Sequence, residues 1–217
     1  MTYKESFIQF MTECGVLTFG EFTLKSGRVA PYFINCGNYR TGGQLRRLGE
    51  YYAACIHENN VPVETLFGPA YKGIPLAVAA ATALSAKYDQ EVFYCFDRKE
   101  AKDHGEGGMF VGKTLTDGEK GVIIDDMMTS GKALRESMPK LMRAAKVDVT
   151  GMIITVDRQE RGTGTTSAVQ EVKAEFGVTV YPIVTMEDII AAIRDEVIPG
   201  KEYLPQMLAY REQYGVN

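Results

Sequence analysis

The sequence predicts an α/β fold in which helices flank a parallel sheet. Short apolar segments alternate along the chain with longer segments whose apolar residues recur at helical spacing. This alternation is typical of parallel strands joined by helices that cover both faces of the sheet. The chain has 217 residues, of which 45% are hydrophobic, which suits one such domain with small additions, or at most two small domains.

The expected elements follow one another in a regular order. Strands are expected at residues 64–68, 91–96, 121–125, 151–156 and 179–184. Helices are expected at residues 3–14, 42–58, 74–88, 132–146, 166–176, 186–194 and 202–214. Residues 16–40 are rich in aromatic and turn residues and predict a small flap, so the chain divides into residues 1–40 and a core of residues 41–217. Pro139 should remove one backbone hydrogen bond and kink its helix.

The bulk composition argues against several classes of protein. A net charge of -4 is a poor basis for wrapping nucleic acid. The N-terminus lacks the apolar run of a signal peptide, and no segment approaches the ~20 apolar residues of a membrane span. The four scattered cysteines form no C-x-x-C pair, which argues against a zinc site or a disulfide framework and favours free thiols in a reducing cytoplasm.

The segment with the most chemical information is GVIIDDMMTSGKA, residues 121–133. A buried strand ends in two carboxylates, Asp125 and Asp126, and a turn then opens a helix. This is where open α/β sheets bind ligands. The free N–H groups of the turn and the helix dipole favour a phosphate, whereas the acidic pair suits ribose hydroxyls or a magnesium ion. The segment therefore predicts a sugar-phosphate site; the alternative is a strand that ends in two solvated acids and an ordinary turn.

On these residues the chain resembles the type I phosphoribosyltransferase family. Its signature is an apolar strand, two acidic residues, two variable residues and Thr-x-Gly. The resemblance implies that Asp125 and Asp126 contact the ribose of phosphoribosyl pyrophosphate (PRPP) and that residues 129–133 hold its 5′-phosphate. Lys132 stands where Thr or Ser is common; its charge could strengthen the phosphate site or point to solvent.

Four further segments resemble the orotate phosphoribosyltransferases in particular. In FGEFTLKSGRVAPYFIN, residues 19–35, the resemblance implies a hood over the base in which Lys25 contacts ligand and Phe33 and Ile34 line the pyrimidine pocket. In LFGPAYKGIP, residues 66–75, Lys72 would meet pyrophosphate oxygens; the alternative is a surface lysine at a helix start.

The third segment, FDRKEAKDHGEGG, combines fixed cations with glycines. Such a stretch is usually a solvated loop, yet a lid over pyrophosphate needs this composition. The resemblance implies a mobile lid at about residues 98–112 whose Lys102 and His104 serve the adjoining subunit of a homodimer. In the fourth segment, VDRQERG, Arg158 would bind orotate through its planar fork. The alternative is a surface ion pair of Arg158 with Asp157 or Glu160.

The resemblance thus assigns roles to a defined set of residues. PRPP binding falls to Lys25, Tyr71, Lys72, Arg98, Lys99, Lys102, His104, Asp125, Asp126, Met127, Met128, Thr129, Ser130, Gly131, Lys132 and Ala133. Orotate binding falls to Lys25, Phe33, Ile34, Thr129 and Arg158. Catalysis is assigned to Lys102, His104, Asp125 and Asp126.

The expected reaction joins orotate to PRPP, with Mg²⁺ held mainly by PRPP and no metal site assigned to the protein itself. The expected partners are these two substrates and a second copy of the chain, without nucleic acid or membrane. Two alternatives remain open. One is a phosphoribosyltransferase for another base, and the other is a regulator that binds PRPP.

Overall fold

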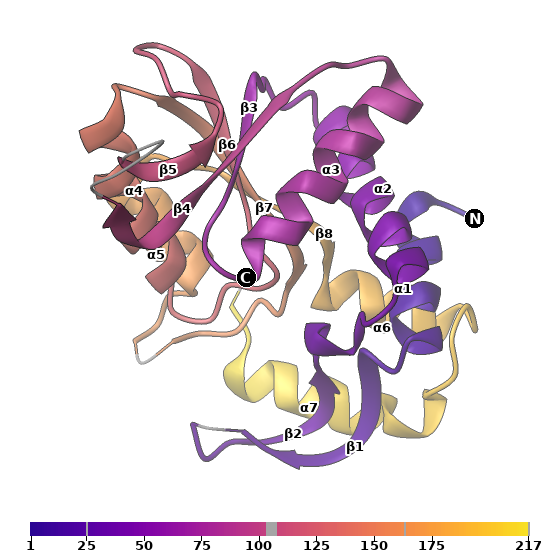
Figure 1. Ribbon diagram of the computed structural model, residues 1–217. Helices are drawn as coiled ribbons and strands as arrows, with labels where there is room; N and C mark the ends of the chain where they lie inside the picture. The colour runs from indigo at the N-terminus through magenta and orange to yellow at the C-terminus, as the bar shows by residue number, and fades with distance from the viewer. Residues whose placement is uncertain (25, 103–107, 163, 217) are drawn as a thin grey trace.

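The computed structural model describes residues 1–24, 26–102, 108–162 and 164–216, with the backbone alone for residues 99–102 and 108 (Figure 1). One sheet has the strand order β5-β4-β3-β6-β7-β8. Its strands are β3 (Thr65–Gly68), β4 (Phe93–Lys102), β5 (Gly108–Gly112), β6 (Lys120–Ile124), β7 (Asp148–Asp157) and β8 (Val180–Thr185). A separate antiparallel hairpin is formed by β1 (Leu17–Thr23) and β2 (Val29–Ile34).

The predicted helices are confirmed. They are α1 (Tyr3–Glu13), α2 (Gly42–Glu58), α3 (Gly73–Tyr88), α4 (Lys132–Ala144), α5 (Ala168–Phe176), α6 (Met186–Arg194) and α7 (Leu204–Tyr214), with short 3-10 helices η1 (Cys36–Asn38) and η2 (Lys201–Tyr203). Capping explains several starts: the Thr41 side chain accepts from the N–H of Gln44, and the Gln44 side chain bonds back to the Thr41 backbone. The helix α4 continues through Pro139, and the predicted kink stays a prediction.

The five neighbouring strands β4, β3, β6, β7 and β8 are parallel, as predicted. The edge strand β5 runs antiparallel to β4. The composition of residues 98–112 predicts a lid loop at about this range, whereas the described part of it contains the end of β4 and all of β5. Antiparallel neighbours need only a short connection. Their ladder uses backbone groups, which the charged and glycine-rich composition of this segment does not reveal.

The sheet separates two hydrophobic clusters because successive side chains of a strand point to opposite faces. Val122 and Ile124 of β6 belong to the larger cluster, with residues of α1, α2, α3 and α6. Ile123, between them, belongs to the smaller cluster, with residues of α4 and α5. The near-continuous apolar runs in the sequence follow from this burial on both faces.

The hairpin β1–β2 and the C-terminal helix α7 lie together beside the sheet, at the bottom of Figure 1. The ring of Tyr32 in β2 meets that of Tyr210 in α7 edge to face, with the centroids 5.9 Å apart. We call residues 17–34 the hood. No described helix is long and apolar enough to cross a membrane. All four cysteines lie in the described part of the chain, and none forms a disulfide.

Candidate active site

Loops that follow β3, β6 and β7 meet at the carboxyl edge of the sheet and bring the predicted residues together. Asp125 and Asp126 follow β6 directly, and Lys72 precedes α3. The Lys72 Nζ lies 2.6 Å from Asp126 Oδ2. This ion pair joins two motifs that are 54 residues apart, and it raises the pKa of the Lys72 ammonium. Because the Lys72 side chain is 69% exposed, the pair serves to place a cation beside the acids more than to stabilise the fold.

The two carboxylates differ in their surroundings. Asp125 is only 9% exposed. Burial, followed by the neighbouring charge of Asp126, raises the pKa of Asp125 to about 6. The Asp125 Oδ1 accepts a 2.8 Å hydrogen bond from the N–H of Asp126, so the two side chains are oriented by their own backbone. Because its pKa is raised to about 6, the Asp125 carboxyl can change charge in the range where enzymes operate.

Two residues that the sequence reading did not assign hold the backbone of this acidic pair. The Tyr52 hydroxyl donates to the Asp125 carbonyl oxygen at 2.8 Å. The Thr155 hydroxyl and N–H both donate to the Asp126 carbonyl oxygen, at 2.5 and 2.9 Å. Tyr52 packs inward, and the partner of its hydroxyl depends on how α2 crosses the strands. The apolar run of β7 gave no signal for Thr155.

The turn after the acidic pair leads into α4 as predicted. Thr129 and Ser130 are exposed, and Gly131 adopts a φ of 69° immediately before Lys132 starts the helix. A Cβ at Gly131 would lie 2.6 Å from Val172 Cγ1, so this position needs glycine for space as well as for conformation. No side chain caps the start of α4, and the first N–H groups of a helix have no partner within it, which is the arrangement that binds phosphate.

Neighbouring side chains fix the outside of this turn. Lys132 pairs with Glu136, one helical turn away, at 3.6 Å. Arg135 donates to the Ser130 carbonyl oxygen at 2.5 Å and is itself paired with carboxylates of α5. Of the two options left open for Lys132, the structure has its ammonium on the helix surface. Met127 bridges to Val156 in β7, Met128 packs in the smaller cluster, and Ala133 lies in the first turn of α4.

The turn that carries Tyr71 and Lys72 is held by Asp97, another residue that the sequence reading missed. Asp97 lies in β4, one position past the residue paired with Gly68, and is 4% exposed. Its Oδ1 accepts from the N–H of Ala70 at 2.7 Å, and its second oxygen pairs with Lys140 of α4. The Ala70–Tyr71 peptide bond is cis. Arg98 follows Asp97 in β4.

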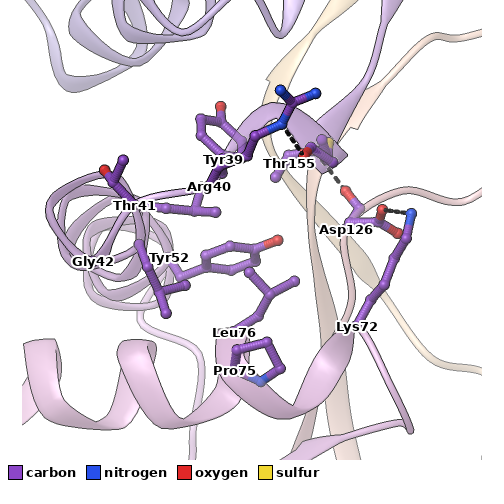
Figure 2. A pocket seen from close by; sticks show the side chains of 14 residues that line it. Tyr39, Arg40, Thr41, Gly42, Tyr52, Lys72, Pro75, Leu76, Asp126 and Thr155 are labelled. Atoms are coloured by element: carbon purple, nitrogen blue, oxygen red, sulfur yellow. Dashed lines mark hydrogen bonds and ion pairs between the residues drawn. The ribbon is translucent and has the colours of Figure 1, made fainter.

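A cavity of about 340 Å³ adjoins the Lys72–Asp126 pair (Figure 2). Figure 2 shows Lys72, Asp126 and Thr155 on one side and the apolar side chains of Tyr52, Pro75 and Leu76 below. Cys36, Gly37 and residues 39–42 also line the cavity. Among the predicted site residues that the structure describes, Lys72 and Asp126 contribute to this lining.

Three of the residues predicted for the base, Phe33, Ile34 and Arg158, lie on the hood and on the segment after β7. Phe33 is 41% exposed and stacks on Phe22 with centroids 5.5 Å apart, whereas Ile34 packs against the larger cluster. Arg158 forms an ion pair with Glu160, with Nη2 3.6 Å from Oε2. An ion pair with Asp157 or Glu160 was the alternative to orotate binding for this residue. Glu160 is buried, however, so this pair is not the surface contact that was expected.

Some predicted contacts fall outside what the structure describes. Lys25 and His104 lie outside the described residues, and so do the side chains of Lys99 and Lys102. Within the described residues no group of three or more His, Cys, Asp or Glu side chains could hold a metal ion. Asp125 and Asp126 alone supply two carboxylates, which fits a magnesium ion that takes its remaining ligands from substrate phosphates and water.

Comparisons with known proteins show the family of this chain. A model of the phosphoribosyl transferase domain matches residues 37–178. The chain is 48% identical to an orotate phosphoribosyltransferase of Lachnoclostridium phytofermentans over 99% of this chain and 98% of the relative. A relative of the same name from Clostridium beijerinckii is 50% identical over 99% of both chains. The crystal structure of orotate phosphoribosyltransferase from Francisella tularensis superimposes with a TM-score of 0.88 at 40% identity, covering 97% of this chain and 100% of that one.

Proposed function

The chain belongs to the orotate phosphoribosyltransferase family, and from that premise we propose how its residues bind and join the two substrates. The reaction transfers the 5-phosphoribosyl group of PRPP to orotate and releases pyrophosphate, a step of pyrimidine synthesis that yields orotidine 5′-monophosphate. The observation that carries the assignment of roles is the Lys72–Asp126 contact of 2.6 Å. It brings a cation for pyrophosphate and a carboxylate for ribose to the same edge of the sheet.

PRPP lies across the acidic pair in this proposal. Asp125 and Asp126 accept hydrogen bonds from the ribose hydroxyls, and the backbone N–H groups of residues 129–133 hold the 5′-phosphate at the start of α4. Thr129 and Ser130 add hydroxyl donors. Lys132 contributes its N–H rather than its charge, because its ammonium pairs with Glu136. Lys72 leaves Asp126 to meet the pyrophosphate, which its exposure allows.

The base lies between the hood and the segment after β7. Phe33 covers one face of the ring with Ile34 beside it, and Arg158 donates to the carboxylate or ring carbonyls of orotate. Lys25 and Thr129 complete the base site as predicted from the family resemblance.

The chemistry is a direct displacement at the anomeric carbon. The ring nitrogen of orotate gives up its proton, which leaves with pyrophosphate or passes to solvent, and forms the new bond as the bond to pyrophosphate breaks. Positive charge therefore develops on the ribose and negative charge on the leaving group. Asp125 and Asp126 stabilise the first, and Lys72, Arg98 and Lys99 stabilise the second. Lys102 and His104 approach the leaving group from the lid, and either could donate a proton to it.

Magnesium would be held mainly by PRPP, with Asp125 and Asp126 as the oxygen ligands of the protein, directly or through water, and would neutralise charge on pyrophosphate. The lid, residues 98–112, closes over the site and excludes water that would hydrolyse PRPP. In a homodimer, Lys102 and His104 serve the site of the adjoining subunit. A cytoplasmic location remains a prediction that rests on the scattered, unpaired cysteines.

The test follows orotate by its ultraviolet absorbance with PRPP and magnesium present, and then with each omitted. Loss of orotate only in the complete mixture, with release of pyrophosphate, is the expected result. A folded protein that binds PRPP and leaves orotate unchanged would contradict the proposal.

A further inference from the structure

Glu160 is a buried carboxylate at the junction of the hood and the core. Its side chain is 8% exposed. The hydroxyl of Tyr32, in strand β2 of the hood, donates to Glu160 Oε1 at 2.5 Å. Tyr32 is itself buried, and its pKa is raised well above the usual value, first by desolvation and then by the charge of Glu160. A carboxylate buried to this extent needs partners that offset the loss of water.

Two arginines share the other oxygen of this carboxylate. Arg28 Nη1 lies 3.7 Å and Arg158 Nη2 lies 3.6 Å from Glu160 Oε2. Arg28 is committed elsewhere as well, because it donates to the carbonyl oxygens of Arg161 and Gly162 at 3.1 and 3.0 Å. Its guanidinium also lies over the Tyr214 ring, 4.6 Å from the centroid. Arg28 therefore acts as a fixed part of the hood–core junction.

Arg158 differs from Arg28 in how few of its hydrogen-bond donors are used within the protein. Its guanidinium makes no hydrogen bond to any residue in the described part of the chain, and its contact with Glu160 is an ion pair longer than a hydrogen bond. The Tyr210 hydroxyl, beside Tyr32, is also buried without a hydrogen-bond partner among the described residues. Donors on a guanidinium held at one end by Glu160 are free to bind a ligand at the other.

Two guanidinium groups, those of Arg28 and Arg158, face the single carboxylate of Glu160. Asp157 is a second acid near Arg158. A base that carries a carboxylate can share the Arg158 guanidinium with Glu160, whereas a neutral pyrimidine offers it no anionic partner.

We propose that Glu160 is a positioning residue for recognition of an anionic base. It orients the Arg158 guanidinium toward the carboxylate of the base, and through Tyr32 it ties that arginine to the hood strand whose next two residues, Phe33 and Ile34, line the base. This inference rests on the proposed function, in which Arg158 binds orotate. It assigns to Glu160 and Tyr32 an effect on base affinity that acts through Arg158.

A double-mutant cycle tests whether Glu160 acts through Arg158. The variants are Glu160→Gln, Arg158→Ala and both together, and the measurements are kcat and the KM values for orotate and for PRPP. Glu160→Gln should raise the KM for orotate about tenfold with little change in the KM for PRPP. In the Arg158→Ala background the same change should have no further effect. Glu196→Gln, which removes a carboxylate from the exposed pair with Lys201, is the matched control and should leave all three constants unchanged.

Tyr32→Phe gives a second, milder route to the same answer if Glu160→Gln does not fold. It should raise the KM for orotate about threefold, again only when Arg158 is present. Additive effects of Glu160→Gln and Arg158→Ala, or an equal rise in the KM for PRPP, would overturn the role of Glu160. A wild-type protein that does not consume orotate would instead refute the proposed function, so the two failures are distinguishable.

Discussion

The hydroxyl of Tyr52 donates a 2.8 Å hydrogen bond to the backbone carbonyl oxygen of Asp125. Tyr52 belongs to α2 and is fully buried, so this bond links the middle of a core helix to the first residue of the acidic pair. The next carbonyl oxygen along the chain, that of Asp126, accepts from Thr155 of β7. The backbone of both proposed ribose-binding residues is therefore fixed from two neighbouring elements.

Removing the Tyr52 hydroxyl should loosen the acidic pair. We expect Tyr52→Phe to lower the free energy of unfolding by about 1 kcal/mol, because a buried carbonyl loses its partner. The KM for PRPP should rise about threefold to tenfold. Tyr51→Phe is the matched control, since the Tyr51 hydroxyl bonds to Ser6 on the neighbouring helix. Equal changes in the KM for PRPP in the two variants would show that the bond to Asp125 has no special role.

Thr155 permits a test that separates its hydroxyl from its bulk. Thr155→Val keeps the shape but loses the donor to the Asp126 carbonyl, and we expect the KM for PRPP to rise about fivefold. Thr155→Ser keeps the hydroxyl and should bind PRPP as the wild type does, with stability lower by about 1 kcal/mol from the lost methyl. Steady-state kinetics and urea unfolding of both variants measure this. A serine variant as impaired in PRPP binding as the valine variant would refute it.

The titration of Asp125 should lower the free energy of unfolding as the pH rises. Burial and the charge of Asp126 raise its pKa from 3.8 to about 6, so the folded state binds this proton more tightly than the unfolded chain. The stabilising contribution is complete below the unfolded pKa and is lost as the pH rises through about 6. Asp125→Asn does not titrate, so at pH 8 it should be more stable than the wild type by up to about 3 kcal/mol.

Urea unfolding at about pH 4 and pH 8 checks this prediction. At the lower pH the two proteins should differ little in stability, because the Asp125 carboxyl of the folded wild type is then largely protonated and therefore neutral, like the amide of the variant. Activity should fall sharply in the variant, because a neutral amide replaces the carboxylate that faces the developing positive charge. A variant less stable than the wild type at pH 8 would contradict the assigned pKa direction.

Asp97 should govern the turn that presents Lys72. Asp97→Ala leaves the buried N–H of Ala70 without its acceptor, and we expect a rise of about tenfold in the KM for PRPP. Asp97→Asn keeps an acceptor for that N–H and loses only the charge that faces Lys140, so its KM should rise less. Lys140→Met isolates the ion pair and should change stability without changing the KM. The prediction fails if Asp97→Asn and Asp97→Ala bind PRPP equally poorly.

Lys102 provides the test of a lid that is shared between subunits. Lys102→Ala should lower kcat about 100-fold, while the KM values change less. In a homodimer with shared sites, refolding Lys102→Ala together with Asp125→Asn should restore about a quarter of the wild-type activity, because half of the dimers then contain one complete site. An unchanged kcat would remove Lys102 from the mechanism. Mixtures that stay inactive would refute the sharing.

Much of the fold and part of the site could be read from local pattern. In the described part of the chain, the alternation of apolar segments predicted all seven α-helices and the five parallel strands, because burial on both faces of a sheet imposes near-continuous apolar runs. The order strand, acidic pair, turn and helix predicted the turn before α4, for which we propose phosphate binding, because these residues are adjacent in sequence. The strand β5 was missed because an antiparallel edge pairing uses backbone groups and leaves little trace in side-chain composition.

The sequence by itself determined the fold class and the family, and it predicted the residues that carry the chemistry, since each of these depends on residue types at short spacing. Only the tertiary structure decided what holds those residues. In the sequence, Tyr52 is one aromatic residue of a helix, Asp97 belongs to a charged, glycine-rich segment, and Glu160 is a possible surface partner of Arg158. Their partners lie 27 to 128 residues away, so they become apparent only when the chain packs. A hydrogen bond between distant segments depends on how helices and strands cross, and no local pattern encodes that geometry.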